Sequence, residues 1–108
     1  MLIVIKEENR FMPTTTIIIK DTVITVEENH VNRELKYDKN QIKLISDALL
    51  KIFKDWNYKY IDKKIIDDDT FTILVVDNER KEYYIKNKYP SNWSKFILFR
   101  NKLLREEL

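Results

Sequence analysis

The chain of 108 residues contains no glycine, no cysteine, one histidine and two prolines. Glycine-rich loops that cradle phosphates, dinucleotides or calcium use backbone conformations that only glycine adopts freely, so these motifs are excluded. Without cysteine, disulfides, thiolate metal sites and cysteine nucleophiles are excluded as well. The single histidine, His30, rules out every multi-histidine metal site. We therefore expect no metal, no cofactor and no evident small-molecule substrate.

The overall charge is nearly balanced, with 20 basic and 18 acidic side chains and a formal net charge of +2. That total does not by itself indicate nucleic-acid binding. The distribution is uneven, because residues 80–105 carry eight basic side chains and one acid, Glu82, which is a local net charge of +7. The sequence therefore predicts a cationic surface in its C-terminal part.

The chain begins with an apolar run that meets Lys6, Glu7 and Glu8 at once. This run is shorter than the roughly 7–15 apolar residues of a secretory signal, and no run approaches the ~20 residues of a membrane span. We expect a cytoplasmic protein with no membrane contact. Lys, Ile and Asn, whose codons are A/T-rich, make up 39 of the 108 residues. This composition favours an origin in a low-GC bacterium, or in one of its phages or mobile elements.

Seven runs rich in β-branched and aromatic residues predict strands at residues 2–6, 14–20, 22–28, 31–37, 60–66, 70–76 and 81–86. Lys20 and Asp21 separate the second run from the third, which predicts a hairpin. Because glycine is absent, Asp21 would have to supply any unusual backbone angles in that turn. No repeat or flexible linker divides the chain, so we expect a single domain over residues 1–108.

Two helices are expected. Asp38 and Gln41 form the pattern of a capping box, and apolar side chains at helical spacing follow through residues 39–57. A second helix is expected after Pro90, with Arg100 inside its apolar stripe and its charged head reaching solvent. Runs of strands separated by helices favour an α+β fold. We expect a mainly antiparallel sheet of about 5–7 strands with one long central helix and a C-terminal helix.

Two short segments carry a resemblance. Residues 66–73 read Ile-Asp-Asp-Asp-Thr-Phe-Thr-Ile, and residues 87–93 read Asn-Lys-Tyr-Pro-Ser-Asn-Trp before the last helix. Over about residues 40–105 the chain resembles small uncharacterised α+β proteins of low-GC bacteria, which have an Asp-Gly-x-Ser/Thr-aromatic strand and an Asn-x-aromatic-Pro element. Here Asp68 replaces the glycine of the first motif, and the glycine near the end of the next strand is absent. The resemblance implies a fold and carries no activity.

Catalytic readings of the polar residues are weak. Asp67, Asp68 and Asp69, with Asp62 nearby, offer the oxygen ligands that hard cations prefer, but three adjacent carboxylates cannot all converge on one ion. We interpret them as a solvated turn. His30 would need a nucleophile such as Ser46, Ser91 or Ser94, and none of these lies in a nucleophile-elbow context. We therefore expect that the protein is not an enzyme, although an unmarked carboxylate site stays open as a third reading.

A basic-aromatic segment runs over residues 81–89, Lys-Glu-Tyr-Tyr-Ile-Lys-Asn-Lys-Tyr. Strand alternation directs Tyr83 and Tyr84 to opposite faces, so one is expected in the core and the other on the surface. Aromatic rings between lysines suit bases stacked along a single strand, and they suit a protein interface equally well. Core packing with solubilising lysines is the third interpretation.

A second candidate contact lies in the last helix. Phe96, Ile97, Leu98 and Phe99 are consecutive, and side chains about 100° apart cannot all face one core. Phe99 stands between Lys95 and Lys102 on one helix face, which is typical of a contact for an acidic protein or for a second copy. Alternatively, Phe99 packs under the N-terminal strands.

The sequence therefore favours a small non-enzymatic binding protein that occupies a partner protein's surface. A phage or mobile-element inhibitor of a bacterial defence system (anti-CRISPR-like) and an immunity protein fit this profile. The residues predicted to contact the partner are Tyr84, Lys86, Lys88, Tyr89, Lys95, Phe99 and Lys102. The alternative is a nucleic-acid-binding module that uses the basic-aromatic C-terminal surface, namely Tyr84, Lys86, Lys88, Tyr89 and Lys95.

Overall fold

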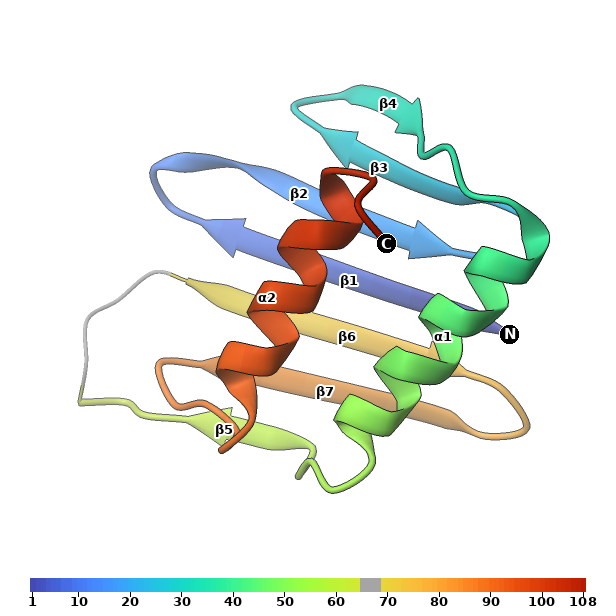
Figure 1. The fold of residues 1–108 in the computed structure, drawn as a ribbon. Helices are drawn as coiled ribbons and strands as arrows, with labels where there is room; N and C mark the ends of the chain where they lie inside the picture. The colour runs from blue at the N-terminus through green and yellow to red at the C-terminus, as the bar shows by residue number, and fades with distance from the viewer. Residues whose placement is uncertain (65–68) are drawn as a thin grey trace.

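The computed structural model describes residues 1–64 and 69–108. It contains a seven-stranded sheet with two helices packed on one of its faces (Figure 1). The elements in chain order are β1 (Leu2–Asn9), β2 (Met12–Ile19), β3 (Ile24–Glu28), β4 (Val31–Glu34), α1 (Lys39–Phe53), β5 (Lys59–Ile61), β6 (Thr70–Val76), β7 (Arg80–Lys86) and α2 (Trp93–Leu104). The strand order is β4-β3-β2-β1-β6-β7-β5. Every neighbouring pair is antiparallel except β5 and β7. The expected α+β fold with a mainly antiparallel sheet is confirmed.

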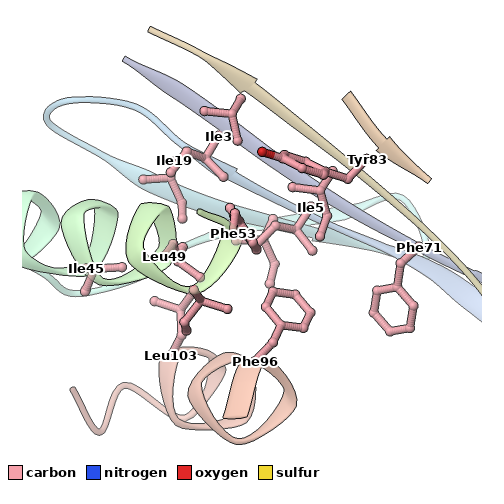
Figure 2. Close-up of a cluster of buried hydrophobic side chains, with 14 of the residues drawn as sticks. Ile3, Ile5, Ile19, Ile45, Leu49, Phe53, Phe71, Tyr83, Phe96 and Leu103 are labelled. Atoms are coloured by element: carbon pink, nitrogen blue, oxygen red, sulfur yellow. The ribbon is translucent and has the colours of Figure 1, made fainter. Parts of the chain in front are cut away.

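The hydrophobic core lies between the two helices and the sheet face that they cover. Alternation along each strand places Ile3 beside Ile19 on β2 and beside Val75 on β6. The next row of the same face joins the side chains Val26, Ile17, Ile5, Ile73 and Tyr83. Leu49 and Phe53 from α1 and Phe96 and Leu103 from α2 cover these rows (Figure 2). Each fully buried aliphatic or aromatic side chain of this kind contributes roughly 1.5–3 kcal/mol before chain entropy opposes it.

The first helix begins as expected and ends earlier. The Asp38 carboxylate accepts from the Gln41 N–H at 2.8 Å, and the Gln41 side chain accepts from the Asp38 N–H, so the capping box is present. The helix ends at Phe53 rather than at residue 57. Trp56 still enters the core, because the chain turns there and the Trp56 N–H donates to the Phe53 carbonyl at 3.0 Å. An apolar residue at helical spacing is thus buried without being helical.

Strand β5 differs most from expectation. Where the prediction has a strand over residues 60–66, the described residues form a strand over Lys59–Ile61, which pairs in parallel with β7 at the edge of the sheet. Residues 65–68, which include the predicted turn residues Asp67 and Asp68, lie outside the described part of the chain. Tyr60 holds β5 in place, because its ring packs edge-on against Trp56 with centroids 6.5 Å apart.

Asp21 does not have the positive φ angle that the predicted turn allowed for; such angles occur at other residues. Asn29 and His30 have φ values of 52° and 62°, and together they form the two-residue turn between β3 and β4. Two consecutive positive φ values match the twist of a tight hairpin. Asn87 has φ 61° directly after β7, near the place where the resembled pattern has glycine. Asparagine tolerates this conformation better than most residues, which explains how a chain without glycine makes these turns.

Candidate functional site

The structure divides the seven predicted contact residues between two faces of the sheet. Tyr84 and Lys86 lie on the face opposite the helices, because Tyr83 and Ile85, their alternating neighbours on β7, are buried under α1 and α2. The other predicted side chains belong to α2 or to the loop before it: Lys88, Tyr89, Lys95, Phe99 and Lys102. The predicted set is therefore not one continuous surface.

The two predicted tyrosines are in different settings. Tyr84 is partly exposed and lies across from Thr72 on β6. Tyr89 is 40% exposed, and its ring stacks on Trp93 with centroids 5.0 Å apart and an angle of 33° between the planes. Because Trp93 in turn packs against the core residue Phe71, Tyr89 lies on the helical side. A strand of nucleic acid cannot stack on both rings along one surface.

A shallow apolar groove of about 190 Å³ lies between the two helices. We call this the helical groove, and its lining residues are Gln41, Leu44, Ile45, Phe99 and Leu108. Phe99 is partly buried and packs against the core from α2. Leu44 on α1 is 70% exposed, which leaves the groove open to solvent.

Two lysines flank the helical groove on α2. Lys95 is four residues before Phe99 and Lys102 three residues after it, and both are exposed. Residues at these spacings are neighbours on a helix surface, so both lysines lie on the same face of α2 as Phe99. Leu98 occupies the same interval and is 57% exposed, which adds apolar surface between the lysines. The expectation that the four-residue apolar run cannot be fully buried is confirmed.

The end of the chain completes the groove. The Tyr37 hydroxyl donates to the Leu103 carbonyl at 3.1 Å and accepts from the Leu108 N–H at 3.4 Å. The Lys36 N–H donates to the Glu106 carboxylate at 2.6 Å. Burial raises the pKa of Tyr37, the Leu108 N–H opposes this rise, and the nearby carboxylates of Glu106 and Glu107 add to it. These contacts hold Leu108 in the groove wall.

Leu44 and Leu108 were not predicted from the sequence. Leu44 carried a usable signal, because it is an apolar residue off the buried stripe of an amphipathic helix. Leu108 carried none, because its position depends on hydrogen bonds between residues about 70 positions apart.

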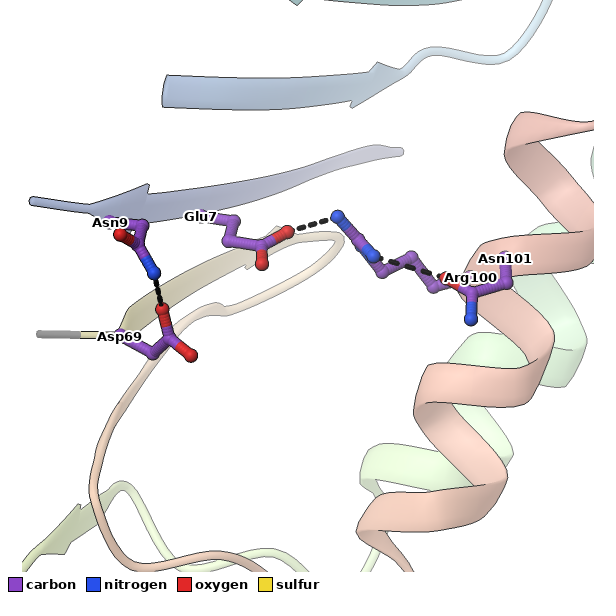
Figure 3. A network of polar contacts seen from close by, with 5 residues as sticks. All are labelled: Glu7, Asn9, Asp69, Arg100 and Asn101. Carbon is purple, nitrogen blue, oxygen red and sulfur yellow. Dashed lines mark hydrogen bonds and ion pairs between the residues drawn. The ribbon is translucent and has the colours of Figure 1, made fainter. Parts of the chain in front are cut away.

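Arg100 links α2 to the sheet instead of reaching solvent. Its guanidinium pairs with the Glu7 carboxylate on β1, lies 6.0 Å from the centre of the Phe71 ring and donates to Asn101 at 3.1 Å (Figure 3). The Arg100 and Glu7 side chains are only 15% and 27% exposed. The prediction that the charged head of Arg100 reaches solvent is therefore wrong. A carboxylate on β1 attracts the guanidinium inward, and the pair fastens the helix to the strand.

The polar residues considered for catalysis are dispersed in the structure. His30 is exposed in the β3–β4 turn, and no described hydrogen bond joins it to a serine. Asp69 accepts a hydrogen bond from the Asn9 side chain (Figure 3). Among residues 1–64 and 69–108, no three His, Asp or Glu side chains form a group that could hold a metal ion.

No family model, curated protein or solved structure matches this chain. Neither of the helices in the described residues is long and apolar enough to cross a membrane.

Proposed function

We propose that this protein is a non-enzymatic binding protein that acts in the cytoplasm by covering a surface of a partner protein. The helical groove is the observation that carries the proposal. Its apolar walls, Leu44, Phe99 and Leu108, come from both helices and the C-terminus, and it is open to solvent. An apolar groove of this kind can accept an apolar anchor side chain of a partner protein.

The groove chemistry selects a class of partner. Lys95 and Lys102 favour carboxylates, whereas the groove beside Phe99 takes an apolar side chain. An acidic amphipathic segment of another protein supplies both the carboxylates and the apolar side chain. The lysines would mainly raise the association rate, and apolar burial beside Phe99 would supply most of the affinity.

A narrower form of the proposal is an inhibitor of a bacterial defence system, anti-CRISPR-like, or an immunity protein. Small size, the missing catalytic signatures and the codon bias toward A/T support it. Such proteins act by occupying a surface, which requires no chemistry of their own.

The direct test is a tagged capture from a low-GC bacterial lysate in which the wild type and three variants are compared side by side. Leu44→Glu places a charge in the helical groove, and Met12→Glu is its matched control, since Leu44 and Met12 are 70% and 66% exposed. We expect a protein captured in stoichiometric amount by the wild type and by Met12→Glu, and lost from Leu44→Glu and from the Lys95→Glu/Lys102→Glu double variant. Phe99→Ala is a poorer probe because Phe99 also packs against the core.

Two results would contradict the proposal. If Leu44→Glu retains the captured protein as well as Met12→Glu does, the groove is not the contact. If the captured material disappears when the lysate is treated with nuclease, the nucleic-acid module takes its place. That alternative also predicts capture that falls steeply with salt, because each phosphate contact releases a counterion.

A further inference from the structure

The face of the sheet opposite the helices is uncovered and apolar at its centre (Figure 1). We call it the outer sheet face. Val4 on β1 lies beside Ile18 on β2 and beside Leu74 on β6, so three apolar side chains form a row across the middle strands. All three are partly exposed. Further partly exposed apolar side chains and threonines surround the row: Leu2, Val76, Tyr84, Thr16, Thr25 and Thr72.

The charges on the outer sheet face are divided between its two sides. On β3 and β4, Glu27 and Glu34 alternate with core-facing neighbours and point outward, and Asn32 lies opposite Glu27. On β7 and β5, the charged side chains that point outward are three bases and one acid: Arg80, Lys86, Lys59 and Glu82. The uncharged Tyr84 and Ile61 lie beside them. Between them, Lys6 and Glu8 on β1 neutralise each other at 3.7 Å. One side of the face therefore carries a formal charge of −2 and the other a charge of +2.

The two edges of the sheet are poor sites for association. The edge strands β4 and β5 have only four and three residues, and every side chain of β4 is exposed. Short, polar edge strands discourage the addition of another strand. The remaining apolar surface of the sheet is its outer face.

We propose that a second copy of this chain packs on the outer sheet face, with the twofold axis parallel to β1. Rotation about this axis places the β3–β4 side of one copy over the β7–β5 side of the other, so that acidic groups face basic groups at both ends of the interface. The same rotation places Ile18 over the second copy's Leu74 and the two Val4 side chains near the axis. A twofold axis across the strands would instead place Glu27 and Glu34 over the second copy's own carboxylates.

The size of the face agrees with this occupant. With strands ~4.8 Å apart and residues ~3.3 Å apart, the outer face spans roughly 600 Å² before side-chain relief is added. A standard stable interface takes about 800 Å² from each partner. The dimer would be a pair of packed sheets with helices on both outsides, and each helical groove would stay open to another protein. The inference is therefore independent of the proposed function.

The first measurement is sedimentation velocity of the wild type over a range of concentrations. We expect a dimer that is half dissociated well below roughly 100 µM. Val4→Lys places two ammonium groups near the axis and should yield a monomer, and lysine is compatible with this face, as Lys6 shows two residues further along β1. Leu44→Glu, on the opposite side of the molecule, is the matched control and should remain dimeric.

A charge exchange tests the arrangement itself and changes only the charges at the two sides of the face. Glu27→Lys/Glu34→Lys and Lys59→Glu/Lys86→Glu should each weaken dimerisation by roughly 100-fold, because like charges would face each other at both ends. Mixed in equal amounts, the two variants should form a heterodimer. A wild type that stays monomeric at roughly 100 µM, a dimer unaffected by either charge change, or a mixture that does not associate would overturn the proposal.

Discussion

Asn92 joins the C-terminal end of α1 to the N-terminal end of α2. Its side-chain oxygen accepts from the Trp56 indole N–H at 2.6 Å, and its side-chain nitrogen donates to the Ile52 carbonyl at 3.0 Å. That carbonyl is one of the last four of α1, which lack a partner within the helix. We expect Asn92→Ala to lower the free energy of unfolding by about 3 kcal/mol, because two hydrogen bonds of ~1 kcal/mol are lost and a buried indole N–H is left unsatisfied.

Urea denaturation followed by tryptophan fluorescence measures this loss, and the melting temperature should fall by roughly 12 °C. Asn57→Ala, at an exposed asparagine directly after Trp56, is the control and should stay within about 0.5 kcal/mol of the wild type. Trp56→Phe removes the donor together with part of the buried ring, and the double-variant cycle with Asn92→Ala separates the two effects. The cycle should show a coupling of about 1 kcal/mol. A loss below about 1 kcal/mol, or simple additivity with Trp56→Phe, would refute the reasoning.

Three further predictions concern stability. Glu7→Gln leaves the Arg100 guanidinium beside Phe71 without its carboxylate, so the free energy of unfolding measured in urea should fall by about 1–3 kcal/mol. The control Glu8→Gln, at an exposed residue, should lower it by less than about 0.5 kcal/mol. Equal losses in the two variants would show that the Glu7–Arg100 pair does not stabilise the fold. Asp38→Ala should cost about 1 kcal/mol by the same assay and Asp38→Asn much less, because asparagine still caps α1. Burial raises the pKa of Tyr83 above its ordinary value of 10.0, and the negative charges that Tyr58 and Tyr60 acquire at high pH raise it further. The folded state therefore keeps a proton that the unfolded chain releases. Stability should therefore fall as the pH rises above about 10, and Tyr83→Phe should reduce that fall in a series of thermal melts.

Much of the fold could be predicted because its signals are local. The alternation in β6 and β7 separates Tyr83 from Tyr84 correctly, and the capping box marks the first residue of α1. The end of α1 was misplaced because the apolar period continues to Trp56, which enters the core from a turn. The edge strand β5 could not be placed, because its three residues gain their order only from pairing with β7.

The candidate site was predicted in part. Phe99 with Lys95 and Lys102 is a single helix face, and spacing along one helix is enough to show it. Tyr84 and Lys86 lie on the other side of the sheet from these residues, which alternation along β7 and spacing along α2 do not reveal together. The other wall of the groove, Leu44, comes from a helix about 50 residues earlier in the chain.

By itself the sequence determined which chemistry is excluded, which face of each strand is apolar and where α1 begins, because composition, alternation and capping depend on a few neighbouring residues. The tertiary structure alone decided the order of the strands, the pairing of Arg100 with Glu7 and the grouping of Leu44, Phe99 and Leu108 around one groove. These features depend on contacts between distant segments. Strand pairing and helix packing set such contacts only when the whole core has assembled.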